Sequence, residues 1–524
     1  MTPRKWSYRR WRLAWWWWRH WGQRRGLAPP APATPEFIEY LSSGPKVMAS
    51  FADNYVPPEQ LTGPRHALTD AGNSLRFTED HDGELIYVEG PGWHVWDGRR
   101  WLRDDKAATV AAKETARRIR FEAAAQQDAD KTNKVFAHAL RSESRARLEA
   151  MVALASKGEI AGPGLVVPVA WLDAHPHLLN CANGTVNLKT GKLSPHRREN
   201  YLTHLIDVDY DPKAKAPRWQ KFLREAFKSN DKLIDYVQRL SGYSITGSNT
   251  EKLFVIAHGE TDTGKSVYSE TLGFLLGELA HVALADTFVS ANQKSGNPAH
   301  DLACMRGARF VRVPETGDNE RLARQVIKTI TGADKVAARF LYAAPFSYRP
   351  QFTIWIVTNH LPQVPHTDAA TWNRIRVIPF RQQAVRRKGR QKPPPETVVM
   401  DKDLRAKLEK ELPGILTWLV QGAYKWFKFG LGEEPIEAVE AKFDYRASQD
   451  TVGRFLDDEV VDDAESRVET TAMYAEYKRW CQSEGLRPIG RNAFHTALRD
   501  RGYHGDSKDS QGVRYYPGLR LNGM

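Results

Sequence analysis

A glycine-rich segment near the middle of the chain holds the residue types that bind the phosphates of a nucleotide. It reads LFVIAHGETDTGKS and fits the pattern G-x-x-x-x-G-K-S, with Gly259, Glu260, Thr261, Asp262, Thr263, Gly264, Lys265 and Ser266 in order. In this motif backbone N–H groups surround the β-phosphate, the lysine reaches the β- and γ-phosphates, and the serine hydroxyl binds Mg²⁺. An apolar strand pattern precedes it, and a helical pattern follows over Val267–Leu276, which is the context the motif requires. The sequence therefore predicts a site for a nucleoside triphosphate with Mg²⁺.

Two later strand patterns end in polar residues that could act on the same nucleotide. The run Arg309–Val313 leads into Glu315, and we expect this strand to lie beside the phosphate-loop strand. Glu315 would then hold Mg²⁺ and polarise the attacking water. The run Phe352–Val357 leads into Asn359, whose amide can hydrogen-bond the γ-phosphate and the attacking water. A glutamate at a strand end is also common in solvated loops, so the upstream motif carries this interpretation.

Two arginines precede a short apolar strand in the segment WNRIRVIPF. One of them, Arg374 or Arg376, could reach the ATP of a neighbouring subunit. An arginine in that position neutralises charge in the transition state and is worth roughly 10³–10⁵ in rate. The alternative for each arginine is a surface salt bridge.

A hairpin is predicted between these strands, over Val336–Phe346, and it carries Lys335, Arg339 and Tyr342. Basic and aromatic side chains together suit contact with the backbone and bases of single-stranded DNA. The alternative is an ordinary surface hairpin with a solvated basic face.

Taken in order, the segments GETDTGKS, RFVRVPET, IKTITGADKVAARFLY, FTIWIVTNHLP and WNRIRVIPF resemble the superfamily 3 helicases. Within them the chain is similar to the phage/plasmid primase-helicase C-terminal family, whose relatives include the poxvirus primase-helicase. The resemblance covers roughly residues 68–380. It assigns Lys265 and Ser266 to the phosphate loop, Glu315 to the acidic second motif, Asn359 to the sensor position and Arg374 to the arginine finger, with Arg376 the alternative.

The resemblance implies an α/β fold with an AAA+-like P-loop ATPase core. It also implies a ring, usually a hexamer, with ATP sites between subunits and 3′-to-5′ movement along single-stranded DNA. Many relatives carry paired acids in the second motif, whereas Pro314 precedes Glu315 here. Longer relatives carry a primase domain upstream, but residues 1–170 hold few strand patterns, so we expect no priming by this chain.

Six regions follow from these patterns. We expect a Trp/Arg-rich low-complexity extension over residues 1–47, an N-terminal adaptor with helices over 48–170, a β-then-α helicase flank over 171–245, the ATPase core over 246–385, a basic Pro-rich loop and helical lid over 386–446, and an α+β winged-helix-like DNA-binding domain over 447–524. In the last region Arg491, Asn492 and Arg499 lie on the expected recognition helix, and packing against the ring is the alternative. The first region could lie on a membrane surface or stack on nucleic acid, or translation could start natively at Met48.

Local patterns also predict elements within these regions. Alternation with turn signals predicts a hairpin unit over residues 84–101 and strands over 178–212 with turns at Gly184 and Gly191. Helices are expected from residue 107 to about 158 and over Trp219–Ser241. In the last region we expect helices over Val452–Val461, Thr471–Glu484 and Asn492–Arg501 and a terminal strand over Val513–Leu521.

Composition limits the remaining possibilities. The chain has 524 residues, a net charge of +13 and three cysteines in no metal-binding spacing. Residues 1–26 hold eight of the basic residues and no acid, so the rest of the chain carries only about +5. Because no uncharged apolar run is long enough to span a bilayer, we expect no stable membrane insertion and a location in the cytoplasm of a bacterial host.

These observations favour an ATP-dependent DNA helicase of a phage or mobile element, acting on single-stranded and forked DNA in replication initiation. A separate primase or replication initiator is an expected partner. Two other functions stay open: an ATP-switched loader or scaffold for replication proteins, and a sequence-specific DNA-binding regulator in which the ATPase is secondary.

Overall fold

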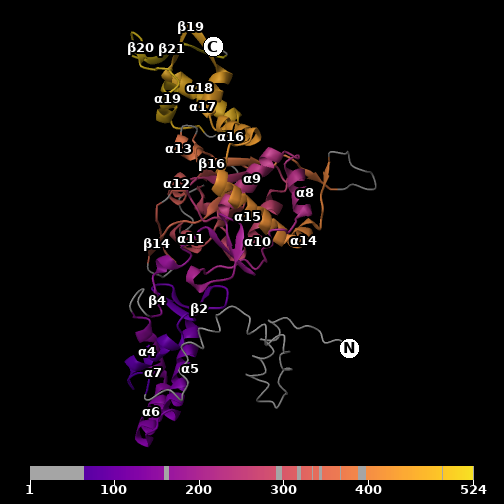
Figure 1. Cartoon of the computed structure of the whole chain (residues 1–524). Helices are drawn as coiled ribbons and strands as arrows, with labels where there is room; N and C mark the ends of the chain where they lie inside the picture. Colours follow the sequence, from indigo (N-terminus) through magenta and orange to yellow (C-terminus); the bar gives the residue numbers. More distant parts are fainter. Residues whose placement is uncertain are drawn as a thin grey trace. The chain divides into compact units, whose positions relative to one another are not determined.

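The computed structural model describes residues 64–158, 164–290, 298–314, 320–332, 334–340, 345–365, 368–386, 397–486 and 488–522 (Figure 1). The predictions for residues 1–47, Glu315 and Tyr342 lie outside these residues. The chain divides into two compact units, one of residues 1–81 and 108–158 and one of residues 82–107 and 159–524. In the described part of the chain, none of the helices has the length and apolar character needed to cross a bilayer.

The first unit is built of helices. These are α4 (Asp70–Asp80), most of α5 (Asp105–Ala124), α6 (Ala129–Ser142) and α7 (Arg145–Ala155). The helices expected from residue 107 to about 158 are confirmed, but α4 was not anticipated. Its start is fixed by Thr69, whose hydroxyl accepts a hydrogen bond from the Gly72 N–H. A buried ion pair, Arg76 to Glu122 at 2.9 Å, joins α4 to α5.

The second unit begins with two small sheets. The strands of the first are β1 (Leu85–Val88), β2 (Gly92–Trp96), β3 (Trp101–Arg103) and β4 (Val166–Val167), and those of the second are β5 (Leu178–Cys181), β6 (Gly184–Asn187) and β7 (Lys192–Ser194). The hairpins expected in both places are confirmed. The helical run expected over Trp219–Ser241 is in fact two helices, α8 (Pro217–Ala226) and α9 (Asp231–Ser244). The break lies at Lys228 and Ser229, whose φ angles of 50° and 55° no α-helix accepts.

A five-stranded parallel sheet forms the centre of the second unit, in the order β16-β8-β15-β11-β9. Its strands are β8 (Phe254–His258), β9 (Ala280–Val282), β11 (Phe310–Pro314), β15 (Thr353–Thr358) and β16 (Ile375–Pro379). One expectation is wrong here. The strand that leads to Glu315, β11, does not lie beside β8, because β15 is inserted between them.

Alternate residues of β8 point to opposite faces of this sheet and belong to two separate hydrophobic clusters. Val255 and Ala257 pack in the cluster that α8, α9 and α15 (Leu412–Phe429) complete. Helices α9 and α15 run together across that face (Figure 1). Phe254 and Ile256 pack in the other cluster, which includes a residue of α16 (Ile436–Ser448). With apolar layers on both sides, β8 is buried along nearly its whole length.

The C-terminal region folds as helix, strand, two helices and two strands. Its elements are α17 (Thr451–Glu459), β19 (Val460–Glu469), α18 (Thr470–Ser483), α19 (Arg491–Arg499), β20 (Ser507–Lys508) and β21 (Arg514–Leu521). The three helices and the last strand match the expected positions. Strand β19 was missed, because its middle is charged and its stability comes from pairing with β21 far along the chain.

Candidate functional site

The glycine-rich segment forms a loop between β8 and α10 (Lys265–Leu276). Two glycines are required by geometry. A Cβ at Gly259 would lie 2.1 Å from the carbonyl oxygen of Phe380, and Gly264 has a φ of 91°. Asp262 also adopts a left-handed conformation, with a φ of 62°. The loop is thus pressed against the residue that follows β16 and turns sharply into the helix.

Lys265 folds back over the loop. Its Nζ donates to the carbonyl oxygens of Gly259 and Glu260, each at 2.6 Å, and lies 3.2 Å from the Thr263 hydroxyl. The lysine is buried, with 6% of its surface exposed. Ser266, the next residue of the helix, is exposed. The ammonium group is therefore positioned at the centre of the loop and the serine hydroxyl at its outer side.

The loop also presents backbone donors. Among the residues that the structure describes, the backbone N–H groups of residues 261–264 donate to no protein acceptor. They precede the N-terminus of the 12-residue helix α10, where the helix dipole favours negative charge. Unpaired N–H groups beside a helix N-terminus and an ammonium group fit a bound phosphate chain. These features fit the predicted nucleotide.

Asn359 comes close to this loop. It follows β15, the direct neighbour of β8, and its Nδ2 lies 3.5 Å from the Thr261 hydroxyl. The backbone carbonyl oxygen of Asn359 accepts a hydrogen bond of 3.2 Å from His258 Nε2. Burial lowers the pKa of His258, and the charges of Lys265 and His360 lower it further, against the opposing effect of that hydrogen bond. The structure thus brings Asn359 to the phosphate loop, next to a histidine whose pKa is lowered.

Sequence reasoning missed two contributors to this site. His258 ends β8 directly before Gly259, and the polar end of an otherwise apolar strand was the available signal. The segment after β16 was the second. The Ala384 N–H donates to the Asp262 carbonyl at 2.9 Å, and Gln383 Nε2 donates to the Thr261 carbonyl at 3.2 Å. No sequence motif marks this segment, whose role depends on the tertiary fold.

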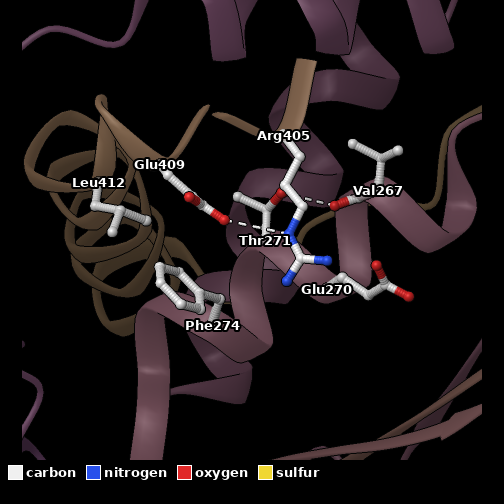
Figure 2. Close-up of a pocket in the computed structure, with 7 residues that line it drawn as sticks. All are labelled: Val267, Glu270, Thr271, Phe274, Arg405, Glu409 and Leu412. Carbon is white, nitrogen blue, oxygen red and sulfur yellow. Dashed lines mark hydrogen bonds and ion pairs between the residues drawn. The ribbon is translucent and has the colours of Figure 1, made fainter. Parts of the chain in front are cut away.

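A separate cavity of about 70 Å³ lies between α10 and α14 (Leu404–Glu409), shown in Figure 2. Val267 is one of its lining residues, and none of the predicted site residues lines it. Arg405 and Glu409, one turn apart on α14, form an ion pair of 3.2 Å beside it, and Phe274 of α10 also lines it. The cavity is small, and its lining contains no residue of the phosphate loop.

The two candidate arginines lie at the far end of the sheet. They flank the first residue of β16, and the parallel pairing places the phosphate loop at the last residue of that strand, roughly 13 Å away. Arg374 donates to the Thr331 hydroxyl and the Ala370 carbonyl, at 3.2 and 2.6 Å. Arg376 forms an ion pair of 3.0 Å with Glu434. Neither arginine comes near the phosphate loop of its own chain.

The predicted hairpin is present as β13 (Val336–Ala338) paired antiparallel with β14 (Phe346–Tyr348). Lys335 and Arg339 are exposed on it. Sequence reasoning missed an aromatic group here. The ring of Phe340, 42% exposed, stacks on Phe346 at 5.6 Å, and the Arg306 guanidinium covers Phe346 at 5.5 Å. This end of the hairpin is therefore basic and aromatic.

On α19 the three candidate residues, Arg491, Asn492 and Arg499, are all exposed. Arg491 Nε lies 3.4 Å from His495 Nε2, one turn along the same face, and Arg499 lies 4.0 Å from Asp506. Burial lowers the pKa of His495, and the two arginines lower it further. The helix thus presents a basic face to solvent.

Three segments of the chain match known families. Residues 74–228 match the family described as "D5 N terminal like", residues 257–375 a family of unknown function, and residues 447–501 the family described as "Poxvirus D5 protein-like". Their order along one chain supports a relationship to D5-like primase-helicases.

Relatives among curated proteins come from large DNA viruses. The chain is 24% identical over 423 residues to "Putative helicase L207/L206" of Acanthamoeba polyphaga mimivirus, which covers 75% of this chain and 43% of that protein. It is 22% identical over 322 residues to "Putative primase C962R" of African swine fever virus (isolate Tick/Malawi/Lil 20-1/1983). That match covers 59% of this chain and 34% of the relative. The chain thus spans less than half the length of these relatives.

Among solved structures, the apo C-terminal region of NrS-1 aligns with 59% of this chain and 77% of its own length, at 12% identity and a TM-score of 0.34. That agreement is too loose to place individual residues.

Proposed function

We propose that this chain is a superfamily 3 DNA helicase that uses ATP and Mg²⁺ to move along single-stranded DNA and separate the strands during replication initiation. We place it in a phage or another mobile element, working in the host cytoplasm. The relatives named as helicases and primases support a role on DNA. The phosphate loop supports ATP as the source of energy.

One observation carries this proposal. Lys265 and the N–H groups of residues 261–264, which donate to no acceptor in the described part of the chain, lie at the end of a central parallel strand, and Asn359 after the neighbouring strand lies 3.5 Å from Thr261. A phosphate-binding loop beside a polar residue on the next strand is the arrangement that ATP hydrolysis needs. A loop that only made a tight turn would need neither the buried lysine nor the nearby amide.

Each residue has a proposed role. The loop N–H groups and Lys265 hold the phosphates, and Asn359 orients the attacking water. Ser266 holds Mg²⁺ together with Glu315, which follows β11, the strand one beyond β15 from the phosphate-loop strand. Bound Mg·ATP supplies the phosphoryl group whose transfer to water releases the energy. His258 would hold Asn359 in position through the hydrogen bond to the backbone carbonyl of Asn359.

The position of the arginines supports assembly of several copies. Arg374 and Arg376 flank the start of β16, whose length of roughly 13 Å separates that end of the sheet from the chain's own phosphate loop, and this favours action on ATP in a neighbouring copy. We propose a ring, with six subunits the expected number, and Arg374 as the residue that reaches the neighbour's nucleotide. The ring would act on single-stranded and forked DNA, with the hairpin residues Lys335, Arg339 and Tyr342 and the α19 residues contacting it. A separate primase or initiator would be its partner.

ATP hydrolysis with and without single-stranded DNA tests the proposal, beside the variant Lys265→Ala. We expect DNA to raise the rate severalfold and the variant to be inactive, because it loses the phosphate-binding ammonium group. If the wild type binds ATP but DNA leaves its turnover unchanged, the helicase is excluded and an ATP-switched loader takes its place.

A further inference from the structure

A lysine–aromatic patch lies on the second unit, on elements that carry none of the proposed site residues. It consists of Lys189, Lys192, Tyr424, Phe427, Lys428 and Phe429. The first two lysines lie on the hairpin of β6 and β7, and the other four residues lie in the last turns of α15. The Lys189 Nζ lies 5.6 Å from the centre of the Phe427 ring, which brings the hairpin and the helix end together.

Two of the three aromatic residues of the patch are exposed, whereas Phe427 is half-buried against the main hydrophobic cluster. Tyr424 is 39% exposed and Phe429 is 64% exposed. Tyr424, Phe427 and Lys428 stand three and four residues apart and so share one face of the helix. The Lys428 Nζ lies 5.0 Å from the centre of the Phe429 ring. A large ring that contributes nothing to a hydrophobic core is left available for another molecule.

The charges of the patch are also available. Among the described residues, Lys189, Lys192 and Lys428 form no ion pair, whereas Lys425 on the same helix is neutralised by Asp235 at 2.7 Å. Glu251 accepts a hydrogen bond of 2.8 Å from the indole of Trp426 on the same helix. Three positive charges therefore face solvent around exposed aromatic rings.

We propose that this patch binds single-stranded DNA, with the lysines on its phosphates and Phe429 and Tyr424 stacked on its bases. An acidic protein would be attracted by the lysines alone, but flat exposed rings between lysines favour a polyanion that itself carries flat apolar groups. Duplex DNA offers no unstacked bases to these rings. The inference rests on the proposed function, and it names a contact surface separate from the β13–β14 hairpin and from α19.

Binding of the full-length protein to a fluorescent oligo-dT strand, followed by anisotropy without ATP over a range of salt concentrations, tests this proposal. The variants are the triple Lys189→Ala, Lys192→Ala, Lys428→Ala, and the single variants Phe429→Ala and Phe429→Trp. A triple variant of exposed lysines elsewhere, Lys106→Ala, Lys402→Ala, Lys410→Ala, removes the same charge and is the matched control.

We expect the patch triple to lower the slope of log affinity against log salt by about 2, at roughly 0.7 for each lost phosphate contact. The control triple should change the slope much less. Phe429→Ala should weaken binding about fivefold or more, and Phe429→Trp should retain it, because tryptophan also stacks on bases. ATP hydrolysis without DNA should be unchanged in every variant. Because Phe429 is mostly exposed, its truncation leaves the core intact.

Two outcomes overturn the patch while leaving the helicase in place. One is wild-type binding by all patch variants together with weakened binding by Lys335→Ala, Arg339→Ala. The other is equal displacement of the DNA by polyglutamate of matched charge, which would mark the patch as a site for acidic proteins. If the wild type itself fails to bind oligo-dT at low salt, the proposed function falls first.

Discussion

Asn359 depends on its surroundings for any effect on the nucleotide. Its side chain reaches the loop at Thr261, while its backbone carbonyl accepts a hydrogen bond from His258. A single amide directed at the attacking water contributes to the transition state more than to ATP binding. We expect Asn359→Ala to lower kcat by roughly 10²-fold, with the ATP affinity nearly unchanged.

Steady-state hydrolysis together with nucleotide binding measured by calorimetry checks this split. Asn359→Asp is the informative companion, because it keeps the size and loses the amide donor. A parallel loss of affinity in both variants would contradict the assigned role and indicate a residue that shapes the loop.

Gly259, in the loop before α10, and Gly273, within α10, offer a matched pair of substitutions. A Cβ at Gly259 would collide with the Phe380 carbonyl at 2.1 Å, whereas a Cβ at Gly273 meets nothing within 4 Å. We expect Gly259→Ala to lower the free energy of unfolding by roughly 1–3 kcal/mol and to abolish ATP binding, because the loop must move. Gly273→Ala should stabilise α10 by up to about 1 kcal/mol. Denaturant titrations that showed equal effects would refute the close approach at Gly259.

At the scale of elements, the direction of β16 decides how the arginines can be used. If Arg374 serves the neighbour's loop in the proposed ring, two inactive variants should complement each other in mixed rings. Lys265→Ala lacks a working loop and Arg374→Ala lacks the finger, yet an interface can pair the intact loop of one with the intact arginine of the other. We expect mixtures to regain hydrolysis that neither variant shows alone.

The assay measures ATP turnover after the two variants are mixed and allowed to exchange subunits. Mixing Lys265→Ala with Lys265→Ala, Arg374→Ala is the control, because neither of those proteins has an intact loop. No recovery in the first mixture, when subunit exchange is seen by fluorescence transfer, would assign the finger to another residue.

Elements whose signals are local were predictable, and pairings between distant segments were not. The strand, loop and helix around Lys265 follow from contiguous residues, and the turns at Gly184 and Gly191 marked the hairpins of β5 to β7. The insertion of β15 beside β8 depends on strand order, which no local pattern encodes. The charged strand β19 and the Gln383 and Ala384 contacts depend on partners far along the chain.

At the scale of the whole molecule, histidines set the response to acid. Burial is the leading cause of a lowered pKa at His94, His138, His177, His196, His258, His281 and His495. Each binds a proton more weakly in the folded protein than in the unfolded chain, whose histidine pKa is about 6.5. The unfolded chain therefore takes up more protons as the pH falls below that value, and the folded state loses stability.

We expect the thermal midpoint to fall as the pH is lowered from 7.5 to 5.5, well above the range in which carboxylates protonate. Asp368, for example, has a pKa lowered to about 2 by its contacts with Lys328, Thr371 and Arg324, which outweigh its burial, so it stays ionised there. Scanning calorimetry at several pH values measures the trend, and His258→Gln should flatten it in part. A midpoint that rose on acidification would reverse the assigned pKa directions.

Strand β16 has a consequence for timing in an assembly. One end joins the phosphate loop of the proposed nucleotide site, since the Phe380 N–H donates to the His258 carbonyl at 2.7 Å and the segment beyond contacts the loop. The other end carries the arginines that would serve the adjacent copy. A hydrogen-bonded strand within a close-packed sheet deforms little and so transmits a displacement from one end to the other. A displacement caused by hydrolysis at one site would thus reach the arginine that serves the adjacent site. The subunits of the proposed ring would then hydrolyse ATP one after another.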